Sequence, residues 1–128
     1  MASWPELSGA LRKSFLVEAD DEDLLMLVLT EGQERQTVFV QLHEGTHGRS
    51  WLRVEAGFGD LATRDLAMGI DYVGMVENLG VGLGRVGDVV TIRWTGFLDG
   101  ISELDVTLMV SSIAGHAKSL ADSLRAHS

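Results

Sequence analysis

The chain of 128 residues has the length of one domain and carries 19 acidic against 10 basic side chains, a net charge of −9 at pH 7. Such a field repels phosphate backbones and anionic headgroups, so neither nucleic acid nor a membrane surface is expected as a partner. The absence of cysteine excludes disulfides and thiol nucleophiles. The N-terminus does not resemble a signal peptide, and the longest apolar stretch, residues 24–29, is too short to span a bilayer, so we expect a cytoplasmic protein.

A first helix is predicted to begin at Ser3, because a glutamate follows three residues later and Pro5 occupies the first turn. Apolar residues then recur at helical spacing, and the helix should end near Leu16. The acidic run over residues 18–23 lacks the spaced ligands of a calcium loop. We therefore interpret this run as a solvated connector.

Three strands are predicted next. Residues 24–30 form a continuous apolar run, typical of a strand buried on both faces, so we place this strand at the centre of the sheet. In residues 37–42 and 51–58 apolar and polar side chains alternate, as they do in strands with one face against the core.

The outer face of these alternating strands carries a candidate partner-binding patch. Phe39 and Trp51 fall on that face by alternation, and Arg53 shares it. Aromatic residues are enriched at protein interfaces, which favours a patch that a partner or second subunit covers. Lone exposed aromatic residues are the alternative, and they are common on protein surfaces.

A second helix is predicted from Asp60, a good N-cap, toward Asn78 and Gly80, which together make a stop. Gly69 and Gly74 inside this helix each cost about 1 kcal/mol relative to alanine. Their presence indicates close packing of this helix against another backbone, from either the sheet or a partner.

The end of the chain is predicted as a hairpin and a long helix. Residues 81–86 and 89–98 flank the pair Gly87-Asp88, a two-residue link of the kind that joins hairpin strands. Ser102 with the acidic residue three positions on forms a capping pair, and one apolar stripe then continues over about residues 103–125. The element order is therefore α-β-β-β-α-β-β-α. It predicts one α+β domain over residues 1–128, with a five-stranded, mainly antiparallel sheet packed with helices.

Two strings in the sequence match catalytic or cofactor motifs. His43-Glu44-Gly45-Thr46-His47 is a literal H-E-x-x-H, which binds zinc only when a helix places both histidines on one face. Here the string falls between two strands and should form a turn. A zinc hydrolase that takes a third ligand from Glu55 or His116 remains an alternative, as does incidental metal binding by the two histidines.

The second string, residues 82–87, is a literal G-x-G-x-x-G. Dinucleotide binding requires these glycines to lie between a strand and a helix, but a strand follows here. Glycines in an edge strand instead permit a bulge, a twist or the close approach of another backbone. We therefore expect no cofactor at this position.

The element order, together with several short segments, resembles the type III secretion chaperone fold and the YbjN family of sensory transduction regulators. The segments that carry the resemblance are Glu77-Asn78-Leu79, Gly84-Arg85-Val86-Gly87-Asp88, Val90-Thr91-Ile92-Arg93 and Leu98-Asp99-Gly100-Ile101, followed by a last helix containing Ala114, Ala117 and Ala121-Asp122. The resemblance implies a small, acidic, cytoplasmic homodimer that binds another protein and has no shared catalytic residue.

Three hypotheses about function follow from the sequence. The favoured one is a non-enzymatic protein-binding module, chaperone-like or regulatory, that engages a partner polypeptide through its sheet face or an edge strand and needs no catalytic residue, metal or cofactor. The first alternative is the zinc-dependent hydrolase built on His43, Glu44 and His47. The second alternative is a stress or signalling regulator that binds a small ligand between sheet and helices.

Overall fold

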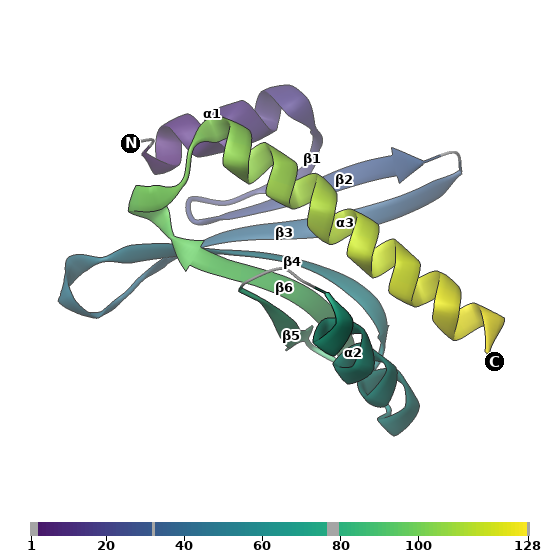
Figure 1. Ribbon diagram of the computed structural model, residues 1–128. Helices are drawn as coiled ribbons and strands as arrows, with labels where there is room; N and C mark the ends of the chain where they lie inside the picture. The colour runs from purple at the N-terminus through teal and green to yellow at the C-terminus, as the bar shows by residue number, and fades with distance from the viewer. Residues whose placement is uncertain (1–2, 32, 77–79, 128) are drawn as a thin grey trace.

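The computed structural model describes residues 3–31, 33–76 and 80–127, and in these residues it forms an α+β fold with three α-helices and one antiparallel sheet (Figure 1). The predicted fold class is confirmed in this form. The elements in chain order are α1 (Trp4–Ser14), β1 (Leu16–Asp20), β2 (Leu24–Glu31), β3 (Glu34–Glu44), the 3-10 turn η1 (Thr46–Gly48), β4 (Ser50–Asp60), α2 (Thr63–Met75), β5 (Val81–Val86), β6 (Val89–Phe97), the 3-10 turn η2 (Leu98–Gly100) and α3 (Glu103–Ala126).

The sheet of the described residues has six strands in the order β1-β2-β3-β4-β6-β5, so the prediction of five strands was wrong. The additional strand, β1, includes part of the acidic run that we expected to be a solvated connector, and it pairs antiparallel with β2. An ion pair of 2.7 Å between Arg12 Nε of α1 and Asp20 Oδ2 compensates one of its charges. Because β1 occupies the edge, β2 lies second in the sheet rather than at its centre.

The second helix begins later than predicted. Asp60 is the last residue of β4 instead of the N-cap, because its backbone pairs with Val89 of β6. The helix starts at Thr63 after Ala62, and the Asp65 carboxylate accepts a hydrogen bond of 2.8 Å from the Asp60 backbone N–H. The helix ends at Met75, with Val76 as its C-cap, which is earlier than the predicted stop at Asn78 and Gly80. Asn78 itself lies outside the described residues.

All three α-helices of the described residues pack on the same face of the sheet. Figure 1 shows α3 crossing this face obliquely, and its buried stripe meets buried side chains of α1 and of four strands. Gly69 of α2 packs closely, since an added Cβ would stand 2.8 Å from the Phe58 ring, but its neighbours are the side chains of Phe58 and Leu83 and not another backbone. The expected close packing was wrong for Gly74, where an added Cβ would meet nothing within 4 Å. The core therefore lies between the sheet and one helical layer.

The last helix follows the prediction closely. The Ser102 side chain accepts a hydrogen bond of 3.0 Å from the Asp105 backbone N–H, and the Asp105 carboxylate accepts one of 3.0 Å from the Ser102 N–H, so a capping box fixes the first turn. These bonds lower the pKa of Asp105 below its ordinary value. Although α3 has 24 residues, no helix among those described is both long and apolar enough to cross a membrane.

Candidate functional site

The face of the sheet opposite the helices, here called the open face, is the main candidate site. It is formed by the even-numbered residues of β2 and β5, the odd-numbered residues of β3 and β6, and residues 51, 53, 55, 57 and, beyond the bulge, 60 of β4, as the strand register requires. The buried apolar side chains on the alternate positions of β2, β3, β4 and β6 face the helices instead. No helix in the described part of the chain packs on the open face.

The three predicted partner-binding residues, Phe39, Trp51 and Arg53, all lie on the open face and are partly exposed. Trp51 is directly opposite His43, with the two rings stacked at 4.4 Å between centroids and 16° between planes. The Arg53 guanidinium carbon lies 5.3 Å from the centre of the Trp51 ring, within the range of a cation–π contact. Phe97, opposite Trp51 on β6, is 51% exposed and adds a further aromatic side chain.

A buried carboxylate lies at the centre of the open face. Glu55 of β4 is only 4% exposed, although its position faces away from the helical core. Its Oε2 accepts a hydrogen bond of 2.8 Å from the Thr91 hydroxyl and lies 3.4 Å from Arg93 Nε. The open face is therefore an ordered polar and aromatic surface.

The G-x-G-x-x-G string lies in the β5–β6 hairpin, where Gly82 and Gly84 face the open side. The Arg93 guanidinium lies directly over Gly84, so that a side chain added at this glycine would overlap it, whereas an added Cβ at Gly82 would meet nothing within 4 Å. Gly84 thus provides the space in which Arg93 reaches Glu55. This use of glycine is unrelated to nucleotide binding.

The H-E-x-x-H string is not helical. His43 and Glu44 end β3, and His47 lies in η1 with a positive φ of 63°. The string therefore lacks the helical turn that places two histidines on one zinc ion. Among the described residues, no group of three or more His, Asp or Glu side chains is arranged to hold a metal ion.

The His43 ring gives the fold a predicted pH dependence. Burial, together with the nearby Arg53 charge, holds the pKa of His43 below its ordinary value of 6.5. As the pH falls through 6.5, the unfolded chain binds a proton that the folded chain does not, so folding stability should decrease. Unfolding measured by urea between about pH 7.5 and 5.5 should show this loss, and a His43→Gln variant should lose less stability over the same range.

The exposed His47 supplies the control for this measurement. A His47→Gln variant removes an imidazole from η1 without touching the Trp51 stack. A pH dependence reduced equally by both substitutions would contradict the assignment to His43.

Two hollows border the open face. At one end, Trp51, Thr95, Gly96 and Phe97 line a space of about 340 Å³. At the other end, pairing of β3 with β4 stops at Val38 and Ala56, while β4 continues along β6 through a bulge.

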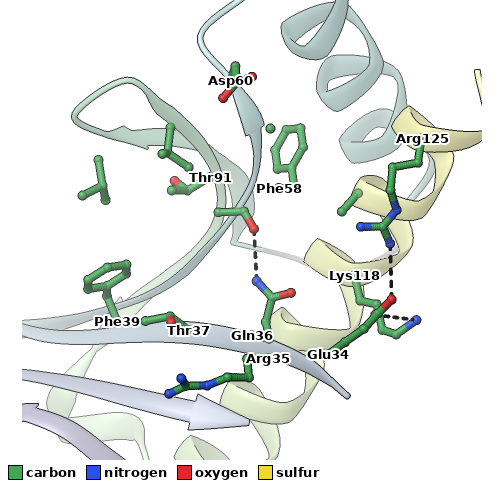
Figure 2. A pocket seen from close by; sticks show the side chains of 15 residues that line it. Glu34, Arg35, Gln36, Thr37, Phe39, Phe58, Asp60, Thr91, Lys118 and Arg125 are labelled. Carbon is green, nitrogen blue, oxygen red and sulfur yellow. Dashed lines mark hydrogen bonds and ion pairs between the residues drawn. The ribbon is translucent and has the colours of Figure 1, made fainter. Parts of the chain in front are cut away.

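The parting of β3 from β4 leaves a cleft of about 550 Å³, shown in Figure 2. Gln36 bridges it with a hydrogen bond of 3.1 Å to the Gly57 carbonyl. Glu34 pairs across it with Lys118 and Arg125 of α3, at 3.4 and 3.6 Å. This cleft is where the small ligand of our third hypothesis would bind, and that hypothesis stays a prediction.

The network of Glu55, Thr91 and Arg93 was missed by reasoning from the sequence. Alternation places each of the three on an outward position, but it does not show which residues of β4 and β6 lie opposite each other, because α2 and β5 separate these strands in the chain. Opposite charges on the outward positions of two strands are the pattern that could have indicated the pair.

The chain matches no protein-family model, and it matches no curated protein. The open face and its residues are therefore interpreted from their own geometry.

Proposed function

We propose that this chain is a non-enzymatic protein-binding module, chaperone-like or regulatory, which engages a partner polypeptide through its sheet. The observation that carries the proposal is the open face, which has three aromatic side chains, an ordered polar centre and no described helix over it. Aromatic residues and arginine are the residue types most enriched at protein interfaces. The non-helical H-E-x-x-H string and the hairpin position of G-x-G-x-x-G favour binding over catalysis.

The proposal extends to the fold family and the compartment. An antiparallel sheet with helices on one face is compatible with the type III secretion chaperone fold and the YbjN family, with β1 added to the expected order of elements. In this proposal the protein acts in the cytoplasm, needs no cofactor, and binds neither nucleic acid nor membranes.

Capture of a partner from the native cell tests the open face. Trp51→Ala and Phe39→Ala each remove an aromatic side chain from that face, and each should reduce capture about tenfold, as truncation of an interface anchor does. Quantitative mass spectrometry of the captured proteins is the measurement.

The matched control is Ile70→Ala, which removes an apolar side chain, 64% exposed, from α2 on the helical side. It should leave capture unchanged. Undiminished capture by both aromatic variants would move the binding site away from the open face.

We propose further that the chain forms a homodimer through α3, because this leaves the open face accessible. Leu104 and Leu108 lie one turn apart on α3 and are 66% and 59% exposed, beside a hollow lined by Trp94 and Ile101. Light scattering at micromolar concentration should give twice the 13.9 kDa mass of one chain. Leu108→Asp should give the mass of one chain, because the charge would be buried at the interface.

Leu16→Asp is the control for the dimer, since Leu16 is 66% exposed but lies on β1. It should leave the measured mass unchanged. A single-chain mass for the unaltered protein would contradict the homodimer without bearing on the open face.

A further inference from the structure

The open face differs in charge from the rest of the molecule. Its outward positions on β2 to β6 carry three arginines, Arg35, Arg53 and Arg93, against two carboxylates, Glu55 and, beyond the β4 bulge, Asp60. The whole chain, in contrast, has 19 acidic and 10 basic residues. A positively charged surface on an acidic protein attracts a negatively charged partner and repels a positive one.

Among the arginines of this surface, Arg53 is the one whose guanidinium group most clearly lacks a hydrogen-bond acceptor in the described residues. Its Nε is buried and makes no hydrogen bond, and no carboxylate in the described residues forms an ion pair with it. Glu55, the nearest candidate in sequence, is already held by Thr91 and Arg93. A carboxylate from a partner would supply the two-oxygen acceptor that a guanidinium group binds best.

An apolar hollow lies next to this guanidinium. Thr95, directly opposite Arg53 on β6, lines the space of about 340 Å³ with Trp51 and Phe97. Opposite residues in an antiparallel pair have Cβ atoms about 5 Å apart. Side chains two positions apart in an extended segment project to the same side at about 7 Å, so one segment could reach both the guanidinium and the hollow.

A second copy of the chain is a poor occupant of this face. A twofold contact between two open faces would bring two surfaces of the same positive charge together, and Glu55 is too buried to reach across. A nucleic acid is disfavoured by the net charge of −9, which opposes its approach.

We propose that the open face binds an acidic, extended polypeptide segment, which brings an Asp or Glu carboxylate to Arg53 and a large apolar side chain, two positions away, to the hollow beside Trp51 and Phe97. This inference rests on the proposed function and identifies the chemistry of the partner. It also assigns Arg53 a role that differs from that of Arg93, whose charge is used within the fold.

Selection of peptides tests the proposal. Random displayed peptides of roughly 12 residues, long enough to follow one strand, are selected on the immobilised full-length chain. The enriched peptides should be net acidic, with Asp or Glu two positions from a large apolar residue. Their affinity, measured by fluorescence anisotropy, should fall about tenfold for Arg53→Gln and weaken as salt rises from about 0.05 to 0.3 M.

Arg85→Gln is the matched control, because it removes the same charge from an exposed position of β5 that faces away from the open side. It should leave the affinity unchanged, and thermal melting of both variants checks that they are folded. Three results would overturn the proposal: enrichment of neutral or basic peptides, acidic peptides whose affinity does not change with Arg53→Gln, or tighter binding of a single-stranded oligonucleotide. Each of them would still be compatible with a binding function of the open face.

Two further outcomes separate this proposal from the one on which it rests. Enrichment of no peptide on the unaltered chain would count against the proposed binding function itself, and against the inference with it. If light scattering shows that Trp51→Ala converts a dimer to single chains, the open face is occupied by a second copy of the chain. This result would overturn the proposal of an acidic segment but not the proposed binding function.

Discussion

Replacing Arg93 with leucine should lower the free energy of unfolding by about 3 kcal/mol, because it leaves the Glu55 carboxylate buried without its cation. The Glu55 side chain is 6% exposed, and after the substitution the Thr91 hydroxyl would be its one remaining polar partner among the described residues. The expected loss is at the lower end of the range for broken buried pairs, since Arg93 is itself 23% exposed and its Nε makes no hydrogen bond. Urea denaturation at neutral pH is the measurement.

The double variant Glu55→Leu with Arg93→Leu should be more stable than Arg93→Leu alone, because neither charge is then buried unpaired. Arg53→Leu is the control, since it removes a neighbouring arginine of the same face that forms no ion pair in the described residues. A loss for Arg93→Leu no larger than that for Arg53→Leu would show that Glu55 does not depend on Arg93.

Substitution of Gly84 should lower the free energy of unfolding, whereas substitution of Gly82 should leave it nearly unchanged. In Gly84→Ala the new methyl group would displace the Arg93 guanidinium from Glu55, and we expect a destabilisation of about 2 kcal/mol. In Gly82→Ala the methyl group meets nothing within 4 Å, so the change should be within about 0.5 kcal/mol of neutral. Denaturant unfolding of both variants provides the comparison.

The effects of Gly84→Ala and Arg93→Leu on the free energy of unfolding should not be additive. Once Arg93 is leucine, Gly84→Ala no longer displaces the guanidinium, so its cost should largely disappear in that background. Equal costs of Gly84→Ala in both backgrounds would contradict the explanation for this glycine. Glycine at position 84 would then be required by another feature of the hairpin.

Elements with a strong local pattern could be predicted from the sequence. Strand β5 has the predicted bounds, Val81–Val86, and the two-residue turn with glycine fixes where β5 ends and β6 begins. Strand β1 could not be recognised, because its acidic composition lacks a strand pattern and its conformation depends on pairing with β2. The start of α2 was misplaced for a similar reason, since Asp60 caps well in isolation but pairs with Val89 in the fold.

The candidate site was predictable only in part. Alternation alone places Phe39, Trp51 and Arg53 on one face, because side chains change sides at every residue of a strand. It cannot show that Glu55 is buried there, since this depends on the register between β4 and β6 and on the space above Gly84. Contacts between strands that are distant in sequence therefore account for most of what was missed.

The outer strands of the sheet have a consequence for solubility. An exposed, flat outer strand can recruit further strands and nucleate fibrils, and proteins avoid this with short strands, bulges and charges. Here β1 has 5 residues, an irregularity between Val17 and Ala19 and a charged Asp20, and β5 has 6 residues with the exposed Arg85. Growth by strand addition is thus discouraged at both edges, which opposes the association that aromatic side chains on one broad surface would otherwise favour.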